Sequence, residues 1–462
     1  MYVQQFTVDG LGCASYLIGC EVHGVAAVID PDRDTRRYLD AVAARGARIS
    51  HIIETHLHAD HISGNTDLAA RTGATICVHE AGRAEFPHAP MRDGDILELG
   101  TARLQVRHTP GHTPDSVTVL AADLRRSGEP WLAFTGDTLF VGDVGRPDLV
   151  GLDAARELAG HLYDSLFGRL LALPDSVLVY PGHGKGSLCG RSIGAMPTTT
   201  LGFERRFNPA LRPRPKPGFV QFATDRLPEQ PANHAWIKQA NRRGPTPLGE
   251  VTPRAIPIGE ALARLDQGAV LLDVRPRVEY VRAHILGSVH LQADPQLSNR
   301  SGFVLPADAP VILLLDDHAA YSRVVLALAR VGFEQVLGCL NGGLNAWQAM
   351  GLPLASGGVH DLSAEALRAM LGAGGGSAPV VLDVREPWEF EQGHVPGARL
   401  FPLGQLLERV RELDPARPTA VICETGNRSQ SAAALLVHRG FAAVYNVSGG
   451  TAAWVRSGFP VE

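Results

Sequence analysis

The sequence predicts a multidomain α/β protein. Its 462 residues exceed the size at which a single hydrophobic core keeps growing, so two or three domains are expected. Short runs of β-branched and apolar residues alternate with amphipathic helical patterns, which is typical of sheets covered by helices. The C-terminal part also repeats itself, which predicts two copies of one α/β unit.

The first strand-like run that leads into candidate functional side chains is Ile49 to Glu54. It is followed by Thr55-His-Leu-His-Ala-Asp-His61 and then by a helical pattern from Ser63 to Ala70. Three imidazoles and a carboxylate in one turn cost solvation and conformational freedom unless something binds them. We therefore interpret this turn as part of a metal site, with four candidate ligands: His56, His58, Asp60 and His61.

Three further candidate ligands each follow a strand-like run. They are His112 after Ala102 to Val106, Asp137 after Trp131 to Phe134, and His183 after Val177 to Tyr180. Small residues flank all three, so the backbone can turn sharply and direct the side chains to a shared centre. The ordered set is far more specific than any one of its members.

This ordered set resembles the metallo-β-lactamase superfamily over roughly residues 1–245. The resemblance implies an αβ/βα sandwich with metals between the edges of two sheets. Hydrolases of this superfamily, such as glyoxalase II, hold two metals. Their pattern implies one site of His56, His58 and His112, a second of Asp60, His61 and His183, and Asp137 between them. Persulfide dioxygenases instead hold one iron, on residues matching His56, His112 and Asp137.

Both uses of the ligands are chemically reasonable. Two imidazoles and one carboxylate on one face leave open positions for oxygen and substrate, as in non-haem Fe(II) oxygenases. A pair of metals, zinc in the hydrolase alternative, would lower the pKa of a bound water towards neutrality. Ligand types alone leave this choice open.

Composition excludes several function classes. An apolar content of 45% and a charged content of 20% suit a globular protein, and a net charge of -5 predicts no nucleic-acid partner. The N-terminus lacks a signal-peptide pattern and no apolar stretch is long enough to span a bilayer, so we expect no membrane partner. Six cysteines without framework spacing favour a cytoplasmic location. We also expect a homo-oligomer.

Proline-rich segments predict the first domain boundary. Asn208 to Gly218 contains four prolines and is expected to be extended rather than helical, and Gly244 to Pro257 completes the exit. The intervening helix, Asn233 to Arg243, is expected to pack back on the first domain. We therefore predict domains at residues 1–245, 246–356 and 357–462.

The last two domains are copies of each other. Val270-Leu-Leu-Asp-Val-Arg275 returns as Val380-Val-Leu-Asp-Val-Arg385, an offset of 110 residues, and Asn341-Gly-Gly-Leu-Asn-Ala-Trp347 returns as Ser448-Gly-Gly-Thr-Ala-Ala-Trp454, an offset of 107. Strands alternate with helices such as Gln430 to Arg439, which predicts a parallel sheet in each copy. Each copy resembles a rhodanese domain.

The second copy carries a candidate nucleophile. The strand Thr419 to Ile422 leads into Cys423-Glu-Thr-Gly-Asn-Arg-Ser429 and then a helix. A thiol that faces backbone N–H groups and a helix N-terminus should be stabilised as thiolate, and Arg428 would add positive charge. The motif resembles the rhodanese active loop, which implies that Cys423 carries sulfur. We call residues 357–462 the active copy.

The first copy lacks the cysteine, the glycine and the arginine of this loop. Its aligned loop is Asp316-Asp-His-Ala-Ala-Tyr-Ser322, in which Asp316 replaces the cysteine and the loop glycine and arginine are missing. A carboxylate cannot accept a sulfane sulfur, so this copy is expected to be catalytically silent and to serve as a spacer or docking surface. We call residues 246–356 the silent copy. The Asp273–Arg275 and Asp383–Arg385 pairs are expected to support the fold of the two copies.

Among the cysteines of the first domain, Cys189 could have either a chemical or a structural role. Cys189 lies six residues after His183, with Lys185 and Arg191 nearby to favour a thiolate. A role in handling sulfur beside the metal and a structural role both remain open for it. The strand-like, apolar surroundings of three other cysteines assign them to the core: Cys13, Cys20 and Cys77.

The domain order resembles bacterial persulfide dioxygenase–sulfurtransferase fusions over nearly the whole chain. The segment Gly142-Asp-Val-Gly-Arg-Pro-Asp148 also resembles persulfide dioxygenases more than glyoxalase II. Within it, Arg146 is a candidate for substrate contact, with a surface salt bridge as the alternative. A hydrolase gains nothing obvious from an attached sulfur carrier, whereas sulfite made by persulfide oxidation could be converted to thiosulfate by a persulfide on Cys423.

The resulting hypothesis is one Fe(II) per chain on His56, His112 and Asp137. It would oxidise a low-molecular-weight thiol persulfide, of glutathione or coenzyme A, with O2 to sulfite, in sulfide detoxification. Four neighbours are expected to shape the site or to hold a second metal: His58, Asp60, His61 and His183. The alternative is a dinuclear hydroxyacylglutathione hydrolase fused to a rhodanese sulfur carrier.

Overall fold

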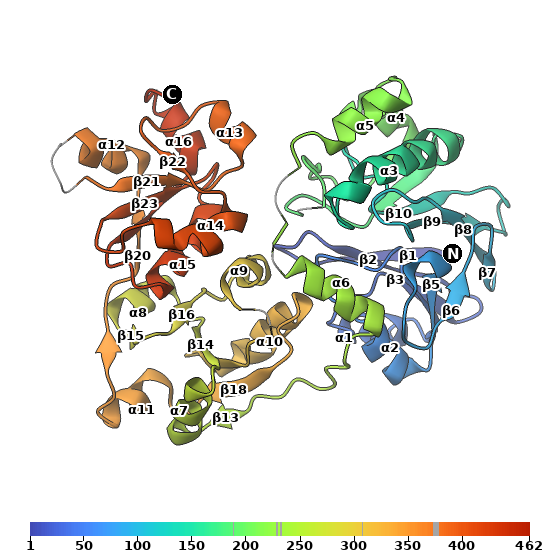
Figure 1. Ribbon diagram of the computed structural model, residues 1–462. Helices are drawn as coiled ribbons and strands as arrows, with labels where there is room; N and C mark the ends of the chain where they lie inside the picture. Colours follow the sequence, from blue (N-terminus) through green and yellow to red (C-terminus); the bar gives the residue numbers. More distant parts are fainter. Residues whose placement is uncertain (188, 228–229, 232, 307, 373–377) are drawn as a thin grey trace. The chain divides into compact units, whose positions relative to one another are not determined.

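The computed structural model describes residues 1–187, 189–227, 230–231, 233–306, 308–372 and 378–462. The chain divides into two compact units (Figure 1). The first unit holds residues 1–227 and 234–250, and the second holds residues 230–231, 233 and 251–462, within the described ranges. Among the described residues we find no helix with the length and apolar character that a membrane crossing requires.

The first unit contains two six-stranded sheets. The first sheet runs in the order β1 (Tyr2–Thr7), β2 (Ala14–Cys20), β3 (Val25–Ile29), β4 (Arg48–Ile53), β5 (Thr75–His79) and β6 (Ala89–Met91). The second runs β12 (Thr199–Thr200), β11 (Leu178–Pro181), β10 (Leu132–Gly136), β9 (Val117–Asp123), β8 (Ala102–His108) and β7 (Ile96–Leu99). Neighbours from β3 to β6 are parallel, as are β10 and β11, and the other pairs are antiparallel.

The two sheets pack face to face with helices outside them. One apolar cluster joins side chains of both sheets, including Tyr16 and Phe134, whose ring centroids lie 5.0 Å apart. The helices α1 (Arg36–Ala43) and α2 (Asn65–Thr72) cover the first sheet, and α3 (Leu152–Tyr163), the π-helical turn η2 (Asp164–Leu170) and α5 (Lys216–Thr224) cover the second. The predicted αβ/βα sandwich is confirmed. The remaining helical elements are η1 (Glu80–Gly82), α4 (Leu201–Phe207), η3 (Pro209–Leu211) and α6 (His234–Arg243).

The expectation that the segment from Asn208 to Gly218 is extended is wrong in part. The 3-10 turn η3 and the start of α5 both lie in it. Pro215 is the N-cap of α5 and Pro217 lies in its first turn. Proline is tolerated there because the first N–H groups of a helix have no partner within the helix.

The second unit contains two five-stranded parallel sheets with the same topology. The silent copy has the order β13 (Ala255–Ile256), β18 (Val336–Leu340), β17 (Val311–Leu314), β14 (Val270–Asp273) and β16 (Val289–His290). The active copy has the order β20 (Val359–Leu362), β24 (Val444–Val447), β23 (Thr419–Ile422), β21 (Val380–Asp383) and β22 (Arg399–Leu400). Two short strands, β15 (His284–Ile285) and β19 (Leu354–Ala355), pair separately.

Helices cover these sheets in both copies (Figure 1). In the silent copy they are α7 (Ile258–Asp266), α8 (Arg277–Arg282), α9 (Leu297–Val304), η4 (His318–Ala320), α10 (Tyr321–Arg330) and α11 (Gly343–Ala349). In the active copy they are α12 (Ala364–Gly372), α13 (Pro387–Glu391), α14 (Leu403–Arg409), η5 (Val410–Glu412), α15 (Asn427–His438) and α16 (Gly450–Arg456). The copies are in contact, because α15 lies against α9 and Phe303 of α9 packs on the core of the active copy.

Candidate functional site

The candidate metal centre lies at the ends of strands from both sheets of the first unit. The ligand-rich turn follows β4, and Asp137 and His183 follow the parallel neighbours β10 and β11. The close approach of these turns requires glycine. A Cβ on Gly145 would lie 1.9 Å from the carbonyl oxygen of Asp137, and one on Gly182 would lie 2.6 Å from Asp137 Oδ1.

His56, His112 and Asp137 form one buried group of donor atoms. One donor atom from each lies within 4.8 Å of the others, and His112 Nε2 is 3.3 Å from Asp137 Oδ2. Within the described part of the chain, His56 Nε2, His112 Nε2 and Asp137 Oδ2 make no hydrogen bond. Buried polar atoms normally have partners, so three such atoms pointing at one place fit a metal ion. The set of two imidazoles and one carboxylate matches the ligands of non-haem iron.

Protonation states in this group suit ligation. Burial and the neighbouring His58 hold the pKa of His56 well below its usual range, and burial also lowers the pKa of His112. Burial alone would raise the pKa of Asp137, but His183 and His112 hold it well below its usual range. Neutral imidazoles and an ionised carboxylate are the forms that bind metals.

His58 lies outside this group. Its Nε2 atom is 3.3 Å from Asp30 Oδ1 and 3.5 Å from Glu54 Oε2, and all three side chains are buried. Burial and His61 would lower the pKa of His58, but Asp30 and Glu54 raise it to about 9. The His58 ring nevertheless lies beside the centre, with its centroid 4.1 Å from that of His56 and 4.2 Å from that of His61, so its expected role in shaping the site stays a prediction.

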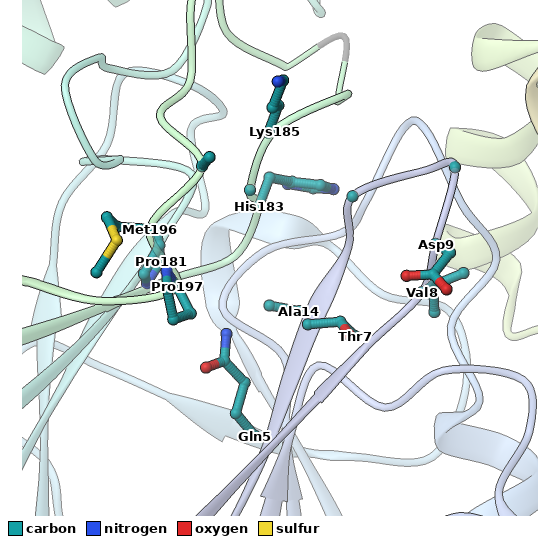
Figure 2. Close-up of a pocket in the computed structure, with 14 residues that line it drawn as sticks. Gln5, Thr7, Val8, Asp9, Ala14, Pro181, His183, Lys185, Met196 and Pro197 are labelled. Carbon is teal, nitrogen blue, oxygen red and sulfur yellow. The ribbon is translucent and has the colours of Figure 1, made fainter. Parts of the chain in front are cut away.

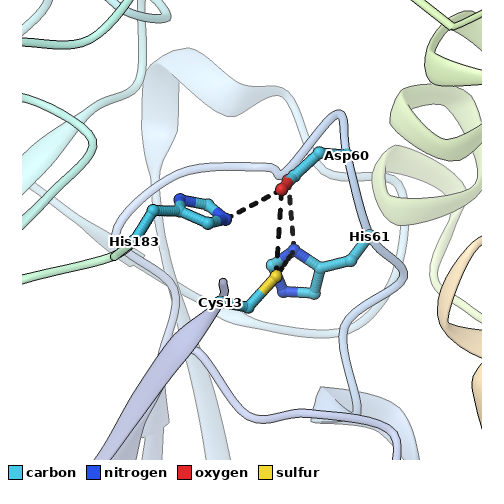
Figure 3. Close-up of side chains that lie close together, drawn as sticks. All are labelled: Cys13, Asp60, His61 and His183. Carbon is cyan, nitrogen blue, oxygen red and sulfur yellow. Dashed lines mark hydrogen bonds and ion pairs between the residues drawn. The ribbon is translucent and has the colours of Figure 1, made fainter. Parts of the chain in front are cut away.

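Asp60, His61 and His183 form a second group, together with Cys13 (Figure 3). His183 Nε2 lies 2.8 Å from Asp60 Oδ2, and Cys13 Sγ lies 3.5 Å from His61 Nδ1. The other ring nitrogen of His183 is 2.7 Å from Asp137 Oδ1, so the two groups are connected. Cys13 was assigned to the core. It is buried, but its thiol belongs to this polar group because β2 begins directly beside His183.

Arg146 supports the first group through its backbone. Its carbonyl oxygen lies 2.9 Å from His112 Nδ1, which directs Nε2 of that ring towards Asp137. Its guanidinium forms a buried pair with Asp148, at 2.7 Å from each carboxylate oxygen. The side chain is only 2% exposed, so the alternative of a surface salt bridge is wrong, and the substrate contact stays a prediction.

Cys189 lies beside the centre without being activated. It belongs to a third close group with Asp137 and His183. Burial and the nearby Asp60 raise the pKa of this thiol well above its usual range. The expected thiolate is therefore wrong for this conformation. The Arg191 side chain donates instead to the carbonyl oxygen of Phe222, so it does not offset the burial of the thiol.

A cavity of about 230 Å³ reaches His183 from the β1–β2 hairpin (Figure 2). Its lining includes Gln5, Gly12, Lys185 and Met196. Because His183 belongs to the second group, this cavity adjoins the centre on that side. Length and composition gave no indication of this cavity.

Asn241 in α6 fixes the ligand-rich turn and was not found from the sequence. Its Nδ2 atom donates to the carbonyl oxygens of His58, at 2.8 Å, and His61, at 2.7 Å. Its Oδ1 atom accepts from the backbone N–H of Ser63 at 2.9 Å. The residue is 180 positions away from His61 along the chain, so no local pattern could have identified it.

Replacing Asn241 by alanine should weaken metal binding. The change leaves two buried carbonyl oxygens unpaired and loosens the turn that carries His56, so we expect the metal affinity to fall by about 10- to 100-fold. Competition with a chelator measures this affinity. Gln239→Ala on the exposed face of α6 is the matched control, and an unchanged affinity in Asn241→Ala would contradict the role.

The sulfur-carrying candidate lies in the second unit. Cys423 directly follows β23 and is buried. Its Sγ atom accepts a hydrogen bond from the Gly426 N–H at 3.1 Å and lies 3.4 Å from Ser429 Oγ. Helix α15 begins at Asn427, three residues before the predicted start at Gln430, so Ser429 lies in its first turn. The loop thus provides backbone and hydroxyl groups around one sulfur atom, as expected.

Arg428 lies close enough to Cys423 to interact with it electrostatically, and it is also paired with a carboxylate. Its guanidinium forms a two-point pair with Glu389 of α13, at 2.7 and 2.6 Å. Burial alone would lower the pKa of Arg428, but Glu389 raises it, and the same pair lowers the pKa of Glu389. Arg428 is therefore shared between Cys423 and Glu389, a residue that the sequence gave no reason to single out.

The silent copy has no comparable loop. Asp316 is exposed, and the neighbouring Asp317 accepts a hydrogen bond from the Ala319 N–H at the start of η4. The supporting pairs are confirmed. Arg275 binds Asp273 and the carbonyl oxygen of Ala283, and Arg385 binds Asp383 and the carbonyl oxygen of Gly393.

Comparisons with known proteins agree with this division. Residues 8–183 match the model of the Metallo-beta-lactamase superfamily, and residues 258–350 and 363–457 match that of the Rhodanese-like domain. The mitochondrial persulfide dioxygenase ETHE1 of Bos taurus is 32% identical over 200 residues, which cover 43% of this chain and 70% of that protein. A hydroxyacylglutathione hydrolase of Polaromonas sp. is 36% identical over 172 residues, 37% of this chain and 61% of that protein.

A solved structure extends the similarity. The structure of a metallo-beta-lactamase from Staphylococcus aureus subsp. aureus COL is 32% identical, with a TM-score of 0.65, and covers 74% of this chain and 98% of that one. The aligned part therefore reaches beyond the first unit. The chain belongs to the metallo-β-lactamase superfamily, as a homologue of the persulfide dioxygenases that is followed by two rhodanese-like domains.

Proposed function

We propose that the protein is a non-haem iron persulfide dioxygenase coupled to sulfur transfer. One thiol persulfide, O2 and water would give the thiol, sulfite and two protons. Sulfite would then take the outer sulfur from a persulfide on Cys423, which gives thiosulfate and returns Cys423 as a thiol. Each step balances without a further oxidant or reductant.

The observation that carries this proposal is the close, buried donor group of His56, His112 and Asp137, which does not include His58. The two-metal hydrolase pattern requires all three imidazoles on one metal. Here Asp30 and Glu54 hold His58 at 3.3 and 3.5 Å, and the remaining group is two imidazoles and one carboxylate. Such a group leaves several coordination positions free, which suits binding of both O2 and a persulfide sulfur.

The chain's own residues would hold and orient the reactants. Fe(II), when bound by His56, His112 and Asp137, would supply open positions for O2 and for the substrate sulfur. The Arg146 carbonyl orients His112, and His183 orients Asp137 through a 2.7 Å contact. Burial of the three side chains keeps bulk water from the centre.

Sulfur loading would occur at the loop that follows β23. The Cys423 sulfur attacks the outer sulfur of a second thiol persulfide, whose S–S bond breaks as a new S–S bond forms on Cys423. The donor leaves as a thiol and takes up the proton released from Cys423. The Gly426 N–H, 3.1 Å from Sγ, donates to the sulfur while negative charge develops there.

One observation favours a second candidate function, a hydroxyacylglutathione hydrolase. Asp60, His61 and His183 lie close enough to share an ion, and a hydrolase is 36% identical to part of the first unit. This candidate requires two metals and hydrolysis of a glutathione thioester without oxygen. It leaves the Cys423 loop without a coupled reaction.

An oxygen electrode separates the two candidates. Iron-loaded protein given glutathione persulfide or coenzyme A persulfide should consume one O2 for each sulfite and thiosulfate formed, and S-lactoylglutathione should give no uptake and no thiol. Oxygen-independent release of thiol from S-lactoylglutathione, with no uptake on either persulfide, would establish the hydrolase instead. Comparison of the two persulfides also identifies the carrier thiol.

Several finer assignments belong to the same proposal. We propose domain boundaries at residues 1–245, 246–356 and 357–462, a cytoplasmic location, a homo-oligomeric state and a role in sulfide detoxification. The partners are the thiol persulfide, O2 and sulfite, without nucleic acid or membrane. Cys189, 2% exposed and grouped with Asp137 and His183, would contact substrate sulfur only after local opening.

A further inference from the structure

A second cysteine with polar groups around its sulfur lies in the first unit. Cys20 is the last residue of β2, and its side chain reaches the turn between β7 and β8 of the other sheet. Its Sγ atom lies 3.2 Å from His23 Nδ1 and 3.2 Å from Thr101 Oγ1. The backbone N–H of Thr101 donates to the same sulfur at 3.5 Å. An imidazole, a hydroxyl group and a backbone N–H thus converge on one sulfur atom.

This group is separate from the metal centre. The strand β2 begins at Ala14, next to the bridge between Cys13 and His183, and it ends at Cys20. Six residue steps of about 3.3 Å each place Cys20 about 20 Å from Ala14. The two ends of β2 therefore belong to two different groups of polar side chains.

Gly100, in the turn between β7 and β8, leaves room for the His23 ring. A Cβ atom on this glycine would lie 2.4 Å from His23 Nδ1, the atom that contacts the sulfur. The φ angle of Gly100 is +62°, a conformation that glycine adopts with little steric cost. The contact between His23 and Cys20 therefore depends on a glycine in the neighbouring sheet.

The hydrogen bonds at this sulfur favour the thiolate form. Burial alone would raise the pKa of Cys20, but hydrogen bonds from Thr101 and His23 lower it to about 6. Cys77, in β5 of the same sheet, shows the contrast. Its sulfur faces the carbonyl oxygen of Thr75 at 3.9 Å, and burial raises its pKa to about 11. Two buried cysteines of one sheet therefore differ in their surroundings, and Cys20 has those of a nucleophile.

The charged groups near this end of β2 interact mainly with one another. Glu98 and Arg103 pair at 3.1 Å across the β7–β8 hairpin, and the Met1 amino group lies 3.5 Å from Asp123. Tyr2 of β1 interacts electrostatically with three residues: Arg45, Glu21 and Cys20. Within the described residues, the side chains that hydrogen-bond to the sulfur are those of His23 and Thr101.

Surface side chains cover the sulfur. Cys20 is 1% exposed, but His23 is exposed, as are its neighbours Glu21 and Val22 in the turn after β2. Exposed side chains change rotamer within picoseconds to nanoseconds. We expect rotation of the His23 ring to open the sulfur to a small reactant, and its return to bring the imidazole back to the sulfur.

We propose that Cys20 is a second sulfur-accepting site, which takes the outer sulfur of a low-molecular-weight thiol persulfide. His23 accepts the Cys20 proton, and Sγ attacks the outer sulfur, so that one S–S bond breaks as another forms on Cys20. The donor leaves as a thiolate and receives the proton from His23. The products are a thiol and the Cys20 persulfide, and no oxidant or reductant is consumed.

The choice of a persulfide as the reactant rests on the proposed function, in which the protein meets such molecules. The Cys423 loop likewise places a backbone N–H and a hydroxyl group at a sulfur atom, those of Gly426 and Ser429. A persulfide on Cys20 would retain the N–H and the hydroxyl of Thr101 as neighbours. The same chemistry is therefore expected at two places in the chain.

The test is mass spectrometry of the full-length protein after anaerobic incubation with glutathione persulfide, which keeps oxygen from the metal centre. Alkylation and digestion then show which of the six cysteines carries an additional sulfur atom. The Cys20 peptide should gain the mass of one sulfur, at a rate at least about 10-fold above that of the Cys77 peptide. In Cys423→Ser the gain at Cys20 should persist, since Cys20 reacts directly with the small persulfide.

Matched variants test the groups around the sulfur through the pH dependence of Cys20 alkylation by iodoacetamide. Thr101→Val removes the hydroxyl and keeps the shape, and His23→Gln removes the imidazole. In each variant the pH of the half-maximal rate should rise by about one unit or more, the effect of one hydrogen bond to a charged sulfur. Thr101→Ser keeps the hydroxyl and should restore the wild-type profile. His161→Gln, at an exposed position of α3, should leave it unchanged.

The outcomes distinguish this site from the proposed function. A gain of sulfur at Cys423 without one at Cys20 would overturn the second site and leave the carrier role intact. A gain at Cys20 without one at Cys423 would support the second site and refute the carrier role. Gain of glutathione instead of sulfur at Cys20, or loss of the gain in Cys423→Ser, would overturn direct uptake. Profiles that superimpose on the wild type in both Thr101→Val and His23→Gln would refute the role of these two residues.

Discussion

Replacing His112 by alanine is expected to abolish iron binding and oxygen uptake together. His112 supplies one of three unpartnered buried atoms of the candidate centre, and the Arg146 carbonyl already directs its ring. Removal of a residue that only supports a ligand typically lowers the metal affinity about 10- to 100-fold, and removal of the ligand itself should lower it further. Elemental analysis of iron per chain and the oxygen electrode measure the two effects.

His58→Gln distinguishes the one-iron proposal from the two-metal alternative in the same experiment. Since His58 contacts Asp30 and Glu54, its loss should lower the melting temperature by leaving two buried carboxylates without a cation, yet the iron content should remain. His161→Ala, on the exposed face of α3, should change neither quantity. Iron retained in His112→Ala, or lost in His58→Gln below the melting temperature, would contradict the proposed ligand set.

Replacing Cys423 by serine is expected to remove thiosulfate formation while sulfite continues to appear. A hydroxyl is nearly the size of a thiol, so the loop should persist, but it cannot carry a sulfane sulfur. Thiosulfate should therefore fall to the level of the uncatalysed reaction, with oxygen uptake unchanged. Ion chromatography of sulfite and thiosulfate over one time course gives both values.

Cys339→Ser is the matched control for this change. Cys339 is the buried cysteine of the silent copy and contacts the carbonyl oxygen of Arg254 and the ring of His318. Its replacement should leave the ratio of sulfite to thiosulfate at the wild-type value. Thiosulfate that persists in Cys423→Ser would mean that another residue, or free persulfide, delivers the sulfur.

The candidate ligands could be recognised from the sequence because each has a local signature. His56, His112, Asp137 and His183 all follow short apolar runs and small residues, and the strands do end there. Parallel neighbours bring such ends to one edge of a sheet. The active loop is recognisable for the same reason, since a strand, a cysteine and a helix start are contiguous between residues 419 and 438.

The role of each side chain in the ligand-rich turn and in the active loop depends on residues that are distant in sequence. His56 and His58 are two positions apart, yet only His56 belongs to the close group with His112 and Asp137, whereas His58 contacts Asp30, directly after β3, and Glu54. Arg428 is next to Ser429 in the active loop, yet Glu389 of α13 takes its guanidinium. Which of two nearby side chains contacts the metal centre or the active loop therefore depends on charged groups that folding brings together.

The fold class, the repeat, the absence of a loop cysteine in one copy and the group of candidate ligands could all be predicted from the sequence. Those properties follow from residue types and spacing along the chain. Folding was needed to show that two buried carboxylates contact His58, that Cys13 belongs to the second ligand group, that Asn241 holds the ligand-rich turn and that Arg277 of the silent copy pairs with Asp361 of the active copy. The physical reason is that directed hydrogen bonds and buried charges join residues far apart in sequence, and their partners exist only once the chain has folded.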